Sequence, residues 1–139
     1  MMAMDDGMGG GGVIQGGTAL GQGLLRYAQT RIGDRYSLNS STTNGPIDCS
    51  GLVWRAMQAN GYEGSRFSTS GFTDLARKGI LQEIPLSQRQ PGDILWMPGH
   101  TGLCFDEKQS LEATPPKVGY YSFNHQRWTK AYRWTGKTK

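Results

Sequence analysis

The sequence lacks several features that would assign it to common protein classes. No apolar run approaches the ~18 residues that can cross a membrane, and the first residues have neither the basic nor the apolar region of a signal peptide. Two cysteines, Cys49 and Cys104, are too few for a disulfide-dense secreted scaffold. With two histidines, His100 and His125, the chain offers no convincing His/Cys cluster for a metal ion. We therefore expect no membrane insertion, no metal and no cofactor.

Acidic residues are missing from the last part of the chain. After Glu112 there are six lysines and arginines but no aspartate or glutamate, and the whole chain carries a net charge of +4. Such a basic end favours a polyanionic partner, such as nucleic acid, an anionic membrane or a bacterial cell wall, although it is also typical of a solvated face. Because no base-stacking or groove-binding motif accompanies these charges, we expect no nucleic-acid partner.

The chain does contain enough large side chains for one folded domain. Four Trp, six Tyr and four Phe compensate for an apolar fraction of 36%, because aromatic side chains bury a large area each. The glycine-rich residues 1–17 are expected to form a flexible leader or linker, and residues 18–139 a single domain.

Apolar spacing predicts helices in the first part of this domain and strands in the second. A helix capped by Thr18 is expected to run to about Ile32, a second capped by Asp48 to cover residues 49–60, and a short third helix to cover residues 69–78. From Ile80 onward, short apolar or alternating runs separated by turns indicate antiparallel hairpins. The expected strands are 93–97, 101–105, 110–113, 118–123 and 131–134. Helices followed by strands predict an α+β fold.

Cys49 has the sequence context of a nucleophile. It lies in an Asp-Cys-Ser-Gly turn at the start of the second predicted helix, where free backbone N–H groups and the helix dipole favour a thiolate. The same N–H groups can stabilise an oxyanion in a transition state. Cys104 instead lies in an apolar strand, so we expect an exposed reactive thiol at Cys49 and an inert core thiol at Cys104, with no disulfide between them.

His100 is the better placed of the two histidines to act as a base. It follows a Pro-Gly turn and leads directly into a predicted strand, whereas His125 lies in a loop. Glu112 is expected on the next strand, where its carboxylate can accept a hydrogen bond from the His100 Nδ1–H and fix the ring. Asp106 and Glu107 are rivals for this role but fall at the expected turn. Each residue alone is more often structural, but together they predict a cysteine hydrolase.

Three strings in the sequence resemble the NlpC-type cell-wall cysteine peptidases of the papain-like superfamily. They are Asp-Cys-Ser-Gly-Leu-Val at 48–53, Pro-Gly-Asp-Ile at 91–94 and Gly-His-Thr-Gly-Leu at 99–103, and the resemblance extends from about Thr18 to Phe123. It implies a papain-like α+β fold, with a helix carrying the cysteine packed on an antiparallel sheet carrying the histidine. It also implies a peptidoglycan endopeptidase that cleaves stem-peptide amide bonds, typically next to D-glutamate or diaminopimelate.

The resemblance also assigns roles to individual residues. Cys49 and His100 match the family's nucleophile and base, and Glu112 matches the third polar residue, which is commonly His, Asn or Gln. Tyr36, together with the Asp48 and Ser50 that flank the cysteine, matches positions that shape the substrate-amine end of the site. The sequence departs from the family at 37–41, where Ser-Leu-Asn-Ser-Ser replaces a frequent Trp-Gly-Gly stretch.

Other functions on related folds remain open at this point. One is a CHAP-like N-acetylmuramoyl-L-alanine amidase, another an acyltransferase or transglutaminase using the same dyad, and a third a wall-binding module without catalysis. Because the chain starts with a glycine-rich stretch and no signal peptide, we expect a bacteriophage lysin, a tail-associated peptidase domain, or a fragment of a longer protein that acts at the bacterial cell wall.

Overall fold

The computed structural model describes residues 12–139, so residues 1–11 of the expected leader lie outside the described residues. Residues 12–17 form neither helix nor strand, but Ile14 packs against the core and the Gly12 carbonyl accepts a hydrogen bond from Gln29. The helices come first and the strands follow, as predicted. In chain order the elements are α1 (Ala19–Thr30), α2 (Cys49–Ala59), η1 (Thr69–Gly71), α3 (Phe72–Arg77), β1 (Leu81–Ile84), η2 (Leu86–Gln88), β2 (Ile94–Met97), β3 (His100–Cys104), β4 (Gln109–Thr114), β5 (Lys117–Ser122), η3 (Phe123–His125) and β6 (Lys130–Trp134).

The two longer helices begin at the residues that the sequence predicts. The Thr18 side chain accepts a hydrogen bond from the Gly21 N–H at the start of α1, and the Asp48 carboxylate does the same for the Gly51 N–H at the start of α2. Both contacts satisfy backbone donors that a helix N-terminus leaves free. The third predicted helix is shorter than expected, because residues 69–71 form a 3₁₀ turn before α3.

The strands form one six-stranded antiparallel sheet in the order β1-β6-β2-β3-β4-β5. The predicted hairpins account for the consecutive strands β2 to β5. Strand β1 was not predicted, because Leu81 and Ile84 face inward around two exposed polar residues and so break the two-residue alternation. Strand β1 pairs with β6, which also pairs with β2, and contacts this distant in sequence leave no local signal.

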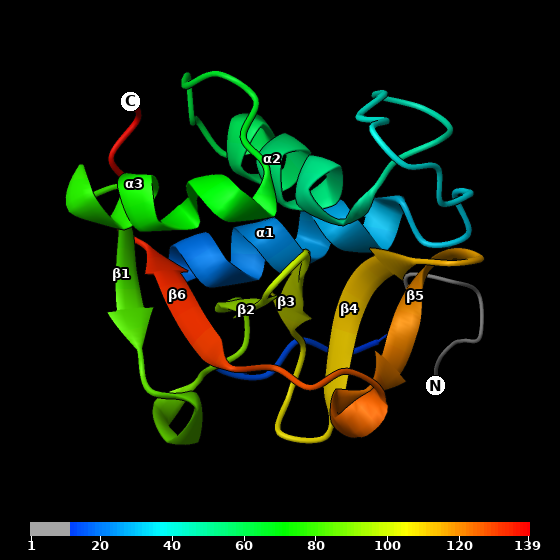
Figure 1. The fold of residues 1–139 in the computed structure, drawn as a ribbon. Coiled ribbons are helices and arrows are strands. Elements are labelled where there is room, and N and C mark those ends of the chain that lie inside the picture. Colours follow the sequence, from blue (N-terminus) through cyan, green and yellow to red (C-terminus); the bar gives the residue numbers. More distant parts are fainter. Residues whose placement is uncertain (1–11) are drawn as a thin grey trace.

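The helices lie together on one face of the sheet, where the larger part of the core forms (Figure 1). Helix α2 packs on β3 and β4, so the predicted second helix lies against the strands that carry His100 and Glu112. A smaller apolar cluster on other residues of the strands includes Leu95 and Cys104 and is joined by Phe123 from η3. This arrangement is the expected α+β architecture.

Among the described residues, no helix combines the length and the apolar character needed to cross a bilayer.

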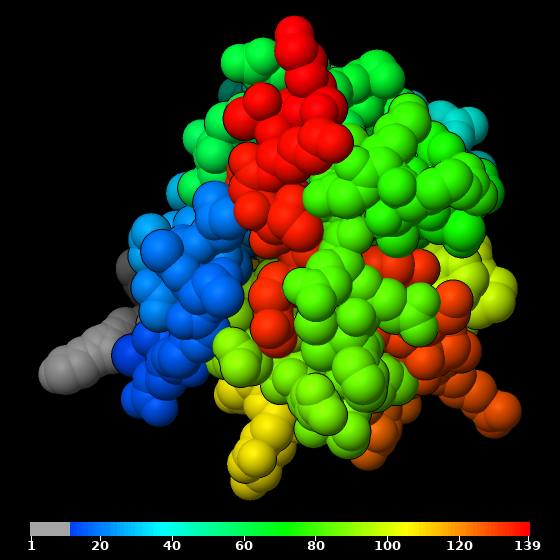
Figure 2. All heavy atoms as spheres, turned by 90° about the vertical axis from the view of Figure 1, so that its left-hand side faces the viewer, coloured from blue at the N-terminus to red at the C-terminus, as the bar shows by residue number. Residues whose placement is uncertain are grey.

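The last residues of the described chain form hydrogen bonds to the segment after α3 and to the loop after α2. Figure 2 shows this C-terminal segment lying between α1 and α3. The Thr135 N–H donates to the Ile80 carbonyl, and the Glu63 N–H donates to the Thr138 carbonyl. The loop at 60–71, which borders the cavity described below, is therefore bonded to the C-terminal segment.

Candidate active site

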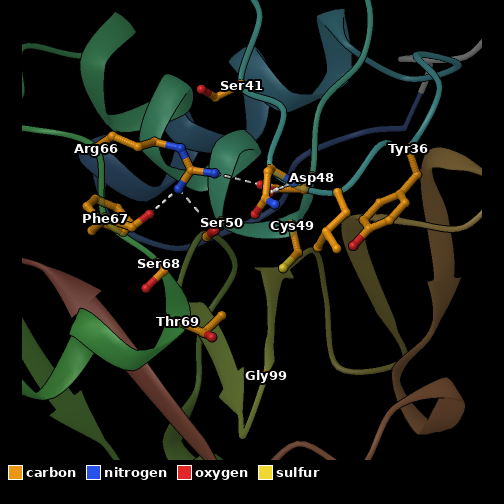
Figure 3. Close-up of a pocket in the computed structure, with 12 residues that line it drawn as sticks. Tyr36, Ser41, Asp48, Cys49, Ser50, Arg66, Phe67, Ser68, Thr69 and Gly99 are labelled. Carbon is orange, nitrogen blue, oxygen red and sulfur yellow. Dashed lines mark hydrogen bonds and ion pairs between the residues drawn. The ribbon is translucent and has the colours of Figure 1, made fainter.

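Cys49 is the first residue of α2, and its side chain points into a cavity of about 470 Å³ (Figure 3). The cavity is lined by the loop before α2, the start of α2, the loop after it and the turn at Gly99. Contrary to the expectation of an exposed thiol, Cys49 is only 8% exposed, because the loops on both sides of α2 cover it. The nucleophile candidate is thus reached through the cavity.

The start of α2 also offers hydrogen-bond donors beside the thiol. Asp48 occupies the Gly51 N–H, whereas the N–H groups of Cys49 and Ser50 have no acceptor within the described part of the chain. Free N–H groups at a helix N-terminus stabilise negative charge. Gly51 is required here, because an added Cβ would lie 2.6 Å from the Ser40 carbonyl oxygen.

Asp48 is buried and bound by several donors. Besides capping α2, it accepts from the Asn39 N–H at 2.9 Å and from Arg66 Nη2 at 2.8 Å. Arg66 also donates to the Ser50 hydroxyl at 3.1 Å. The guanidinium of Arg66 and the ring of Tyr36 flank Cys49 on opposite sides of the cavity (Figure 3). Sequence patterns do not single out Arg66, because its loop carries no recognisable motif.

Tyr36 lines the same cavity as Cys49. Burial, followed by the nearby charges of Cys49 and Asp48, raises the pKa of the Tyr36 hydroxyl above its ordinary value of 10.0. Tyr36 therefore stays a neutral hydroxyl at physiological pH and can both donate and accept a hydrogen bond. The structure thus brings all three residues expected at the substrate-amine end, Tyr36, Asp48 and Ser50, to the wall around Cys49.

His100 begins β3 and bonds to Glu112 on the neighbouring strand β4. Its Nε2 lies 2.7 Å from Glu112 Oε1, so the expectation that Nδ1 makes this contact is wrong. The ring has Nε2 turned towards β4, which leaves Nδ1 for a reacting group. The His100 ring also stacks on the indole of Trp128, with centroids 5.4 Å apart and planes inclined by 19°.

The environment of His100 favours its protonated form. Burial alone would lower the pKa of His100, but hydrogen bonding to Cys49 and Glu112 and the charges of both groups outweigh it and raise the pKa from 6.5 to about 9. Of these two partners, Cys49 has the larger effect through its hydrogen bond, and the Glu112 contact is the 2.7 Å bond described above. At neutral pH the imidazole is therefore mostly protonated and can deliver a proton.

Glu112 is completely buried and accepts hydrogen bonds from three side chains. His100 and Gln126 contact Oε1, the latter at 3.0 Å, and the Ser110 hydroxyl donates to Oε2. Gly102 lets the two strands approach, because an added Cβ there would lie 2.8 Å from the Glu112 Cβ. Neither Ser110 nor Gln126 was a candidate from the sequence, since each acts only through the folded position of Glu112.

The rejected candidates lie elsewhere. Cys104 is free and buried, and burial raises the pKa of its thiol to about 11, which agrees with an inert core thiol. His125 is in η3 and stacks on Tyr121. Asp106 accepts hydrogen bonds from backbone N–H groups in the turn between β3 and β4. Within residues 12–139, no three His, Cys, Asp or Glu side chains gather closely enough to hold a metal ion.

Comparison with known protein families gives one match. The model of the NlpC/P60 family matches residues 33–137 of the chain, which include the whole cavity and the His100–Glu112 pair. No curated protein sequence matches the chain closely enough to count as a relative.

Solved structures show the same fold. The P60 domain of an antigen from Mycobacterium avium subspecies paratuberculosis is 20% identical, with a TM-score of 0.67, over 85% of this chain and 96% of that domain. The peptidoglycan hydrolase RipB from Mycobacterium tuberculosis is 26% identical, with a TM-score of 0.62, over 81% of this chain and 63% of RipB. A mutated form of the Resuscitation Promoting Factor Interacting protein RipA is 23% identical, with a TM-score of 0.64, over 83% of this chain and 62% of RipA. The chain thus spans less than two thirds of the RipB and RipA chains.

Proposed function

Because the chain belongs to the NlpC/P60 family, we propose that it is a cysteine peptidase that hydrolyses amide bonds in the stem peptides of bacterial peptidoglycan. The family and its peptidoglycan-hydrolase neighbours support a peptidoglycan hydrolase in general. The observation that carries the finer proposal is the meeting of Cys49, at a helix N-terminus, with a histidine that bonds to a buried glutamate.

The proposed reaction begins with attack of the Cys49 thiolate on the carbonyl carbon of the amide. The N–H groups of Cys49 and Ser50, which have no other acceptor in the described chain, hold the resulting oxyanion. The protonated His100 donates its Nδ1 proton to the leaving amine, which departs and leaves a thioester on Cys49. His100 then takes a proton from water, the hydroxide displaces the thiolate, and the carboxylic acid product is released.

Glu112 is proposed as the third member of this site. Its carboxylate fixes the orientation of the His100 ring and stabilises the imidazolium that persists until the amine leaves. Two of the solved structures with this fold are of RipA mutated at a histidine in one case and at a glutamate in the other, twelve positions apart. His100 and Glu112 have the same separation in this chain, which supports the assignment.

Substrate binding is proposed for the cavity wall. Tyr36 is half-buried and can contact the substrate directly, whereas Asp48 and Ser50 are buried and bonded to Arg66. We propose that Asp48 and Ser50 act mainly through the charge and shape of the wall.

The expected cut next to D-glutamate or diaminopimelate is part of the proposal, as is delivery by a bacteriophage tail or lysin. Phage structural genes beside the coding sequence would support that delivery, and secretion genes would contradict it.

The experiment that tests the function compares the wild type with Cys49→Ala on purified peptidoglycan under reducing conditions. We expect soluble peptide fragments from the wild type and a rate lower by at least ~10³-fold for the variant. Mass spectrometry of the fragments identifies the bond that is cleaved. Cys104→Ala is the matched control, because it removes the buried thiol that lies in the smaller apolar cluster, and it should retain activity.

The other outcomes separate the alternatives. Hydrolysis by Cys49→Ala at the wild-type rate would sink the assignment of the nucleophile. A free L-Ala amine and a lactyl end on the glycan would identify an amidase. Transfer of the acyl group to an added amine, in place of water, would identify an acyltransferase. Retention on the wall without released fragments would identify a binding module.

A further inference from the structure

The Glu112 carboxylate lies in an environment that is costly for a charge. The side chain has no exposed surface, and a buried carboxylate is tolerated only when it is paired and its oxygens accept hydrogen bonds. His100 supplies one donor, on Oε1. The remaining donors come from Gln126, on the same oxygen, and from Ser110, on Oε2.

Ser110 reaches Glu112 because both lie on β4 with one residue between them. Alternate residues of a strand point to the same face, so Ser110 and Glu112 share a face and Leu111 points to the other one, into the main core. Ser110 is itself fully buried. The other acceptor near the Ser110 hydroxyl, the Tyr121 carbonyl, is 3.5 Å away. The hydroxyl therefore donates its hydrogen bond mainly to Glu112.

Gln126 reaches the same carboxylate from a different part of the chain. It lies between η3 and β6, two residues before the Trp128 whose indole stacks on His100. Because an ionised carboxylate only accepts hydrogen bonds, the amide nitrogen of Gln126 must face Glu112. The segment at 126–128 therefore contacts both members of the His100–Glu112 pair.

We propose that Ser110 and Gln126 are positioning residues, which hold the Glu112 carboxylate aligned on His100 Nε2. This inference rests on the proposed function, for which His100 must be correctly oriented. A carboxylate has two equivalent oxygens and can turn about its last bond. With Ser110 on Oε2 and Gln126 on Oε1, rotation breaks two hydrogen bonds in addition to the one with His100.

The proposal makes Glu112 dependent on its neighbours in a way that a neutral residue is not. An amide at this position would bring its own N–H donors and would carry no charge to be compensated. A buried glutamate needs external donors on both oxygens. Ser110 and Gln126 therefore supply the hydrogen-bond donors that a buried glutamate requires at the third position of this site.

The test uses Ser110→Ala and Gln126→Ala, each purified as the full chain. For both variants we expect kcat on peptidoglycan fragments to fall by about tenfold, with KM within about twofold of the wild type, because ring orientation matters after the substrate has bound. NMR titration of the His100 ring should show a lower pKa than in the wild type, because the facing carboxylate is less well aligned. Cys49 and Glu112 are the titratable groups that act on this ring.

Two controls keep the result specific. Ser87→Ala and Gln82→Ala change exposed residues of the same two types on η2 and β1, and both should keep the wild-type kcat and His100 titration. The readings are taken at a temperature where circular dichroism shows each variant to be folded.

The outcomes separate this inference from the proposed function. If the folded variants keep both kcat and the wild-type His100 titration, or raise KM alone, the positioning role is overturned. If the wild type cleaves no peptidoglycan, the proposed function fails, but the NMR titration needs no substrate and still decides whether Ser110 and Gln126 act on His100. A lower His100 pKa in both variants would then support the inference for whatever reaction the dyad performs.

Discussion

The two halves of the site are built in different ways. The half on α2 is local: Asp48, Cys49 and Gly51 are neighbours in sequence, and one helix N-terminus supplies the cap, the thiol and the free N–H groups. The half on the sheet is assembled from three separate segments, since His100 is on β3, Glu112 on β4 and Gln126 in the loop before β6. Helix geometry therefore organises the first half, whereas long-range packing and charge compensation organise the second.

This difference predicts which half responds to pH and which to changes in helix capping. The sheet half contains an ion pair between His100 and the buried Glu112, and His100 loses its charge as pH rises through about 9. The helix half relies on hydrogen bonds of Asp48 that have donors on the backbone and on Arg66. The predictions below use this contrast, starting with the largest effect.

The pH dependence of stability should reveal the sheet half. The pKa of His100 is raised from 6.5 to about 9 in the folded chain, so the folded state holds a proton that the unfolded state releases in this interval. The stabilising contribution is fully present below about pH 6.5 and is lost as pH rises through about 9. Because one pKa unit corresponds to about 1.36 kcal/mol, the free energy of unfolding should fall by about 3 kcal/mol across this window. Urea unfolding at a series of pH values measures it.

The matched control for this prediction is Glu112→Gln. The variant keeps the shape of the side chain but removes one of the two groups that raise the pKa of His100, the other being Cys49. Its unfolding free energy should therefore fall less than that of the wild type between pH 6.5 and 9. An equally steep fall in the variant would show that the pH dependence arises elsewhere, and the contrast between the two halves would then not rest on this ion pair.

Glu112→Gln should also change the kinetics. We expect kcat/KM to fall by about tenfold to a hundredfold, because the imidazolium loses its charged partner. The alkaline limb of the pH–rate profile should move from about pH 9 towards lower pH, since the pKa of His100 falls when the Glu112 charge is removed. A pH–rate profile on soluble peptidoglycan fragments measures both effects. Wild-type kinetics in the variant would transfer the orienting role to another residue.

The same contrast explains what could be predicted from the sequence. The cap at Asp48, the start of α2 at Cys49 and the choice of His100 over His125 follow from neighbouring residues, and the structure places each as expected. The pairing of His100 with Glu112 was also predicted, because a short hairpin connects their strands. The ring nitrogen was predicted wrongly, because the sequence gives the order of the strands but not the rotamer of the imidazole.

Features that depend on distant segments were missed. Within residues 12–139, strand β1 pairs only with β6, about fifty residues later, and a short non-alternating strand has no signature of its own. Arg66 and Gln126 lie in loops, and only the folded chain brings them to Asp48 and Glu112. The burial of Cys49 was missed for the same reason, since the loops that cover it are not adjacent to each other in sequence.

The smallest expected effects concern the caps of the two long helices. Thr18→Ala removes the side-chain cap of α1 and should cost about 1 kcal/mol of unfolding free energy, with kcat unchanged, because α1 carries no cavity residue. Asp48→Asn keeps a capping oxygen but should cost about 1–3 kcal/mol, since one acceptor oxygen becomes an NH2 that faces a donor, and it removes the charge that faces Arg66. We therefore expect kcat to fall in Asp48→Asn alone.

Thermal unfolding and kinetics on the same two variants check this prediction. If both lose stability and neither loses rate, the ion pair of Asp48 with Arg66 only supports the fold, and the helix half needs nothing beyond a capped N-terminus. If the rate falls only in Asp48→Asn, the helix half also depends on a contact from the loop at 60–71. The two halves would then share one design, in which a buried carboxylate is held by donors from distant loops.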